Sequence, residues 1–228
     1  DTNNPVAFTA AKTISSVVNN TNPIYDIAVY SDNVNVGNGV FVINTSGTTT
    51  IAVGYLTTEG ALGTPGSGFP GVVTITSTNA TESITICADK VNTATADEER
   101  IYVAYSSTGS SAGLKLKRLQ SLLIVEATHT VEGTATKIDG VSMIVTQAGD
   151  LQIIYTLDAS LTYSHLVKGT VYDISADSVA TPAIIKRSVG LASKIWEYAG
   201  AKYFIVVHDS ALQPTYFLCD TTGLISAK

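Results

Sequence analysis

Apolar positions recur along the chain in runs of five to eight residues rich in Val, Ile, Thr and Tyr, and Gly, Asn, Asp and Ser separate these runs. Such runs, bounded by turn-forming residues, are typical of β-strands joined by tight turns. The nearest candidate for an amphipathic helix is 114–125, but its Leu-Lys-Leu-Lys start alternates with period two and its Leu-Leu-Ile-Val centre fits a buried strand equally well. The pattern therefore predicts an all-β protein.

The strongest strand centres recur at a regular spacing. Their first residues, Val40, Ile101, Leu151 and Tyr203, lie 61, 50 and 52 positions apart. A turn and an upstream strand precede each centre, and a third strand follows it after another polar turn. The upstream strands are expected at 27–30, 84–88, 142–145 and 194–198, and the third strands at 51–55, 114–116, 170–174 and 215–218.

A period near 50 residues with three or four antiparallel strands is typical of a β-propeller blade, because one small sheet cannot cover its own faces and must stack on its neighbours. We expect a single propeller-like region, either a complete ring or part of a larger propeller. Its four blade-like repeats are placed at 24–71, 72–132, 133–189 and 190–228. An ordinary β-sandwich is the alternative.

Equivalent positions in the repeats should hold Val42, Val103, Ile153 and Ile205. The Gly- and Pro-rich stretch 60–71 lengthens the first spacing and is expected to be a connection between blades. The chain starts without Met and ends on a strand-like stretch, so we interpret it as a segment of a longer polypeptide.

Composition narrows the classes of function. Apolar residues make up 45% of the 228 residues and charged residues 14%, which excludes intrinsic disorder. No apolar run approaches the ~18 residues of a membrane span. The net charge is −6, and the basic residues gather only at Lys115, Lys117 and Arg118, so tight binding to nucleic acid phosphates is not expected. Cys87 and Cys219 lie far apart in apolar runs and are expected to be reduced core residues.

Motifs for catalysis are not apparent. His129, His165 and His208 have no zinc-binding spacing, and the adjacent His208-Asp209-Ser210 does not make a triad, which is assembled in space. Nucleotide-binding glycine motifs are missing. We therefore expect no catalytic residue, no cofactor and no metal ligand, and so no enzyme.

Two weaker patterns point the other way. A propeller glycosidase of the sialidase kind would need its arginines to converge, and the chain has only Arg100, Arg118 and Arg187. The acidic stretch 97–99 could bind Ca²⁺ but fits a solvated turn better. The remaining candidates are contacts with a partner, through Phe69 in the Gly-rich loop and Trp196 in the last repeat.

The last repeat, 190–220, has a strand, a glycine hairpin, an aromatic strand ending in a polar turn and then Leu-Gln-Pro-Thr-Tyr-Phe. It resembles segments of propeller-like proteins in the tails of short-tailed bacteriophages, of the nozzle or tail-tubular type. The resemblance implies a structural virion protein in a ring through which DNA is ejected. The implied location is the virion tail. The implied partners are copies of itself and neighbouring tail or portal proteins, with no sequence-specific nucleic acid contact and no membrane span.

A hypothesis from another class is a carbohydrate- or receptor-binding propeller on a virion or cell surface, with glycosidase-like activity as one form of it. Aromatic side chains such as Trp196, Tyr163 and Tyr198 would then stack on sugar rings. Binding on a glycan array or release of sugar would favour this hypothesis. Ring-shaped assemblies without sugar binding would favour the tail protein.

Overall fold

The computed structural model describes residues 24–28, 37–45, 50–57, 72–77, 83–89, 100–107, 113–120, 122–133, 138–146, 150–158, 165–188, 190–198, 201–208, 214–219 and 225–226. All regular structure within these ranges is β-strand. The same ranges contain no helix of the length and apolar character that would cross a membrane.

The strands form four antiparallel sheets. The first contains β1 (Tyr25–Ala28), β2 (Gly37–Thr45), β3 (Thr50–Thr57) and β4 (Val73–Ser77). The second contains β5 (Ile84–Ala88), β6 (Arg100–Ser107), β7 (Gly113–Gln120) and β8 (Val125–Glu132). The third contains β9 (Ile138–Val145), β10 (Leu151–Asp158), β11 (His165–Asp173), β12 (Ser178–Val179) and β13 (Ala183–Ser188). The fourth contains β14 (Gly190–Tyr198), β15 (Ala201–His208), β16 (Pro214–Cys219) and β17 (Ile225–Ser226).

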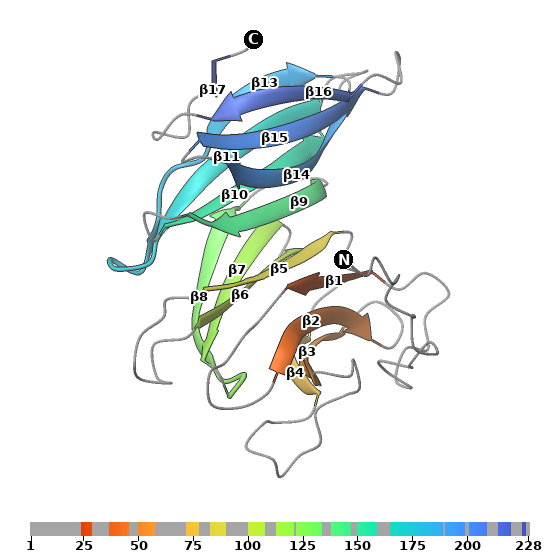
Figure 1. Ribbon diagram of the computed structural model, residues 1–228, viewed down its shortest axis with the longest axis vertical. Helices are drawn as coiled ribbons and strands as arrows, with labels where there is room; N and C mark the ends of the chain where they lie inside the picture. The colour runs from red at the N-terminus through yellow and green to blue at the C-terminus, as the bar shows by residue number, and fades with distance from the viewer. Residues whose placement is uncertain are drawn as a thin grey trace, which may run out of the picture.

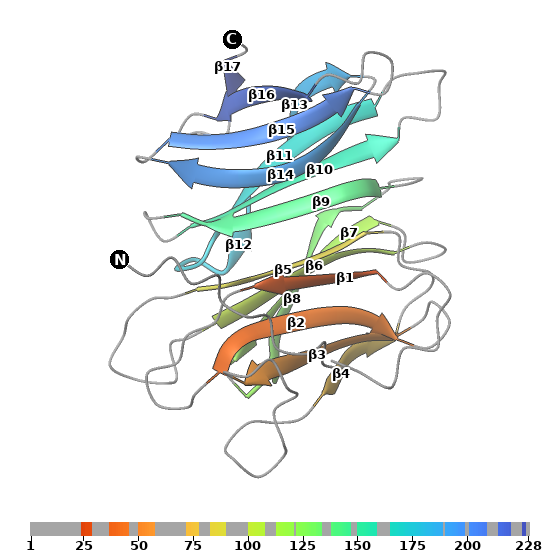
Figure 2. The same ribbon diagram turned by 45° about the vertical axis from the view of Figure 1, so that its right-hand side comes forward.

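The sheets stack on one another in chain order, with the first sheet at one end of the molecule and the fourth at the other (Figure 1). The first strand of each sheet lies beside the first strand of the next, from β1 to β5, β9 and β14 (Figure 2). We call these four the inner strands. The expected repeat is confirmed, because Val42, Val103, Ile153 and Ile205 each lie in the second strand of a separate sheet. Successive stacked sheets, three of four strands and one of five, confirm the propeller-like class over the sandwich.

Side-chain alternation explains the stacking. Successive residues of a strand point to opposite faces of its sheet. On β6, Val103 packs in a core shared with the first sheet, whereas Tyr102 and Ala104 pack in a second core shared with the third sheet. The second sheet therefore contributes apolar side chains to a core on each of its faces.

Three details differ from the sequence-based expectations. Val73–Ser77 is β4 and pairs with β3, so the first repeat extends beyond residue 71. The ambiguous stretch 114–125 is strand β7, a tight turn and the start of β8, and Leu123 turns the chain with a φ of 60°. The outer edge of β11 pairs with two short strands, which are separated at 180–182, where Pro182 has no N–H to donate.

Candidate functional site

Polar side chains line one face of the inner strand β5. In the stretch Ser-Ile-Thr-Ile-Cys-Ala-Asp, the isoleucines enter the core shared with the first sheet. The intervening residues, Ser83, Thr85, Cys87 and Asp89, are all buried. We call these four residues the β5 polar row. Buried polar groups are costly unless they are hydrogen-bonded, so the partners of this row show what holds it.

The row is bonded to the inner strands on both sides. On β1, Tyr25 and Ile27 are exposed and Asp26 faces inward, where its Oδ2 accepts hydrogen bonds from Thr85 Oγ1 at 2.7 Å and from the backbone N–H of Ile86 at 3.0 Å. In the other direction, Ser83 Oγ accepts from the N–H of Gly140 at 2.9 Å.

The next junction repeats this arrangement. Ser142 Oγ on β9 accepts from the N–H of Ile195 on β14 at 3.2 Å. At each of the three junctions, a short polar side chain thus satisfies a backbone donor of the following inner strand.

Two carboxylates converge on this row. Burial raises the pKa of the Cys87 thiol strongly, and the negative charges of Asp89 and Asp26 raise it further. Cys87 is therefore a neutral, free thiol, as expected for a reduced core residue, and it is not a nucleophile. Asp26 of the first sheet and Asp89 of the second thus both lie within electrostatic range of one side chain.

A second polar cluster joins the second and third sheets near the end of β5. Glu126 Oε2 pairs with Arg100 Nε at 2.6 Å and with Arg118 Nε at 3.2 Å. The other side of Arg118 reaches across to the third sheet, where Nη1 lies 3.1 Å from Asp177 Oδ1 and donates to the Tyr172 hydroxyl at 3.0 Å. We call these five residues, with His129, the rim cluster.

The turn between β11 and β12 places Asp177 in this cluster. Asp173 Oδ1 accepts from Ser175 Oγ and from the N–H of Ala176, which fixes the turn, and Asp177 follows with a φ of 50°. Asp177 Oδ1 then accepts from the Tyr172 hydroxyl at 2.6 Å and lies 2.8 Å from His129 Nε2. The bond from Tyr172 is the main cause that lowers the pKa of Asp177, so this group acts as a charged anchor and not as a proton donor.

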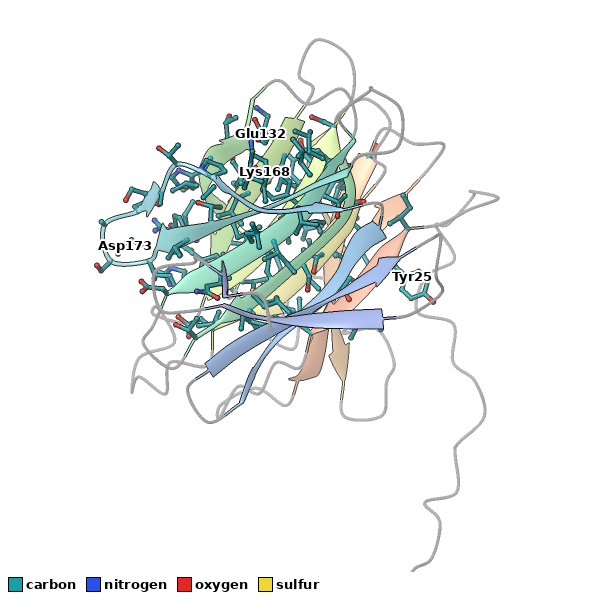
Figure 3. The ribbon with its side chains drawn as sticks, turned by 90° about the horizontal axis from the view of Figure 1, so that it is seen from above. Tyr25, Glu132, Lys168 and Asp173 are labelled. Carbon is teal, nitrogen blue, oxygen red and sulfur yellow. The ribbon has the colours of Figure 1, made fainter. Side chains whose placement is uncertain are left out.

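A third group, the Glu132 clamp, joins the same two sheets at their other end. Glu132 Oε2 accepts from the Tyr155 hydroxyl at 2.9 Å and pairs with Lys168, and Figure 3 shows Glu132 beside Lys168, whereas Asp173 lies at the margin of the molecule. Burial acts to raise the pKa of Glu132, but the bonds from Lys168 and Tyr155 outweigh it and hold the pKa below its ordinary value. The clamp is a charged tie between the sheets.

Several candidate residues from the sequence lie outside the part of the chain that the structure describes. Phe69 and Tyr163 lie outside the described residues, and of Trp196 and Tyr198 the structure describes the backbone of β14 but not the side chains. The acidic stretch 97–99 also lies outside the described ranges.

Of the three histidines, His129 enters the rim cluster, and His165 and His208 lie in separate sheets. Arg100 and Arg118 do converge, but on Glu126. Within the described residues, no three His, Cys, Asp or Glu side chains are grouped as metal ligands would be. Asp26, Asp89 and Asp177 were not predicted, although the alternation of polar and apolar residues along 83–89 is visible in the sequence.

No protein-family model and no curated protein matches the sequence. Solved structures do share its fold. An exo-β-1,3-galactanase from Phanerochaete chrysosporium with galactose is 12% identical, with a TM-score of 0.54 over 83% of this chain and 45% of that chain. A thermostable family-43 glycoside hydrolase is 10% identical, with a TM-score of 0.54 over 94% and 75%. An endo-arabinase from Bacteroides thetaiotaomicron is 6% identical, with a TM-score of 0.53 over 91% and 81%.

These likenesses define the class: the chain has the β-propeller architecture found in family-43 glycoside hydrolases. It spans less than half the length of the exo-galactanase. At these identities the likeness shows the fold and not the activity.

Two expectations from the sequence are corrected. The chain was expected not to be an enzyme, but the similar structures are a galactanase, an arabinase and other glycoside hydrolases. The interpretation as a structural nozzle protein of a phage tail is wrong on the same ground, because that resemblance rested on strand and turn patterns that any propeller blade shares. Nothing in the structure bears on the expected ring of identical copies, on the neighbouring tail or portal partners or on the virion location, which stay predictions of the sequence.

Proposed function

We propose that this chain is a carbohydrate-acting β-propeller whose glycan site lies at the inner strands β1 and β5, with Asp26 and Asp89 as its two carboxyl groups. The observation that carries the proposal is that Asp26 of the first sheet is hydrogen-bonded to Thr85 and Ile86 of β5, and that Asp89 follows the end of the same strand. The fold supports it, since solved structures of the same architecture are glycoside hydrolases.

The chemistry of glycoside hydrolysis gives this pair a role. Most such enzymes use two carboxyl groups, about 5–9.5 Å apart, one of which donates a proton to the leaving oxygen while the other acts as base or nucleophile. Asp26 suits the second role, because Thr85, Ile86 and Ile27 all donate hydrogen bonds to its oxygens and fix them as acceptors. Asp89 is the second carboxyl of the pair.

The rim cluster and the Glu132 clamp suit structural roles instead. The pKa values of Asp177 and Glu132 are both lowered, whereas the proton donor of a glycosidase needs a raised one. These two groups hold the second and third sheets together, and so keep the inner strands in place.

Release of reducing sugar tests the proposal. The substrates are β-1,3-galactan, arabinan and xylan, because the similar structures are described as galactanase, arabinase and xylanase. Asp26→Asn and Asp89→Asn should each reduce release by roughly 100-fold or more. Asp173→Asn is the matched control and should keep full activity, since asparagine forms the same turn.

Thermal unfolding of the three variants separates loss of chemistry from loss of the fold. Binding on a glycan array without turnover would restrict the function to carbohydrate recognition. The proposal would be overturned if the folded protein neither released sugar nor bound any glycan. Full activity of both site variants would overturn it as well.

A further inference from the structure

Tyr102 lies on β6 in the core between the second and third sheets and is fully buried. Among the residues that the structure describes, its hydroxyl has no hydrogen-bond partner. Buried hydroxyl groups in proteins almost always have a partner, either from the protein or from an ordered internal water. The other buried tyrosines of this core do have one: the Tyr155 hydroxyl donates to Glu132, and that of Tyr172 donates to Asp177.

The surroundings of Tyr102 are polar on two sides. In the sheet it lies opposite Cys87 on β5 and opposite Arg118 on β7. Across the core, its ring meets the Tyr172 ring edge-on, with centroids 5.9 Å apart. Asp89 follows Cys87 by two residues, one position past the end of β5, and its N–H donates to the Arg100 carbonyl at 2.9 Å, so it continues this side of the strand diagonal to Tyr102. Tyr102 thus stands between the β5 polar row and the rim cluster.

The electrostatics of Tyr102 agree with this arrangement. Burial raises the pKa of Tyr102 strongly, and the charge of Asp89 is the next cause, ahead of Tyr172 and Cys87. A neutral phenol facing a carboxylate is a hydrogen-bond donor, so Asp89 is the acceptor that this geometry offers. A single water, which needs two to four polar partners, suits a site bordered by Tyr102, Asp89 and the Cys87 sulfur.

We infer that Tyr102 is a positioning residue for Asp89, and that its hydroxyl donates to one internal water which in turn donates to the Asp89 carboxyl. The role of Asp89 in sugar chemistry rests on the proposed function, whereas the link between the two side chains does not. Through this link, the position of Asp89 at the inner strands depends on the side chains between the second and third sheets.

Tyr102→Phe tests the link by the sign of its effect on stability. If the hydroxyl has no partner, its removal relieves a buried unsatisfied group and stabilises the protein. If it binds the water, its removal orphans that water and the carboxyl, and the urea midpoint falls. We expect the midpoint to fall, and a midpoint that rises or stays unchanged would overturn the inference.

A double-mutant cycle identifies the partner. Tyr102→Phe and Asp89→Asn should be non-additive, with a coupling of roughly two- to tenfold in the unfolding equilibrium constant. Tyr155→Phe is the matched control, because its hydroxyl is bonded to Glu132, and its effect should add to that of Asp89→Asn within error. Additivity of the Tyr102 and Asp89 substitutions would refute the link.

The pH profile of sugar release separates positioning from general stabilisation. Tyr102→Phe should lower kcat, leave KM unchanged and shift one limb of the profile, whereas Tyr155→Phe should leave the profile in place. A profile unmoved in Tyr102→Phe would overturn the positioning role. If the wild type releases no sugar, the proposed function fails, and the unfolding cycle still decides the link by itself.

Discussion

Gly113 begins β7 at a point where only glycine fits. Its φ is +133°, a conformation that residues with a side chain rarely adopt, and a Cβ built on it would lie 2.0 Å from the backbone oxygen of Glu132 on β8. The obstacle is backbone and not the flexible end of a side chain, so it cannot move aside alone. Gly113→Ala must therefore displace the end of β8, and with it the carboxylate that ties the second sheet to Tyr155 and Lys168.

The expected cost has two parts. Holding alanine in this backbone conformation costs about 1–3 kcal/mol. Separating the ends of β7 and β8 removes the last ladder hydrogen bonds and weakens the Glu132 clamp, at about 1 kcal/mol or more. A total of about 2–4 kcal/mol corresponds to a fall in Tm of roughly 4–16 °C for a chain of this size.

Thermal and urea unfolding followed by circular dichroism measure this cost, and Gly133→Ala is the matched control. A Cβ on Gly133 meets only Thr130 Cγ2, at 3.9 Å, and its φ lies outside the left-handed range. The control should therefore change stability by no more than about 1 kcal/mol. A Gly113→Ala variant that melts within about 2 °C of the wild type would refute the reasoning.

Three further predictions concern the ties between the second and third sheets. Because the pKa of Asp177 is lowered in the folded state, its contribution to folding stability is present above pH ~4 and is lost as the pH falls through the lower folded value. Asp177→Asn should therefore flatten the acid limb of the stability curve measured by urea titration. Burial raises the pKa of Tyr172 to about 12, so its contribution to folding stability is complete below pH ~10 and is lost as the pH rises to about 12. Tyr172→Phe should remove this loss of stability at alkaline pH. An unchanged alkaline limb of the stability curve would contradict the prediction. Lys168→Met should cost about 1–3 kcal/mol because it leaves the half-buried Glu132 charge without its cation, and adding Glu132→Gln should restore part of that stability. Calorimetric Tm values that simply add would argue against the pair.

The blade pattern was predictable because each strand is short and locally encoded. Ile84–Ala88 was expected as a strand with the bounds that the structure gives it, and the second strands were found from their β-branched and aromatic centres. The outer strands were harder. Residues 125–132 hold three consecutive polar residues at 128–130 on a partly exposed edge, and 178–188 are interrupted at Pro182, so neither makes a strong apolar run.

The site could not be derived from sequence motifs, because its carboxyls come from different sheets. Asp26 and Asp89 are 63 positions apart, and only the stacking of β1 on β5 brings them together. Asp177 reaches Arg118 and His129 because it adopts a left-handed backbone conformation at the end of a turn. No spacing of residues in the sequence predicts that contact. The one usable signal was a strand with polar residues on its buried face, from Ser83 to Asp89.

The most direct measurement of the proposed function is the footprint of a bound oligosaccharide by hydrogen exchange, with Asp89→Asn used to slow turnover and β-1,3-galactotriose as the probe. We expect slowed exchange in 24–28 and 83–89, the segments that contain the two carboxyls, and unchanged exchange around the β11–β12 turn at Asp173. Protection confined to other strands would contradict the proposed function. So would the absence of protection when galactotriose, arabinan and xylan oligosaccharides are each tested at saturation.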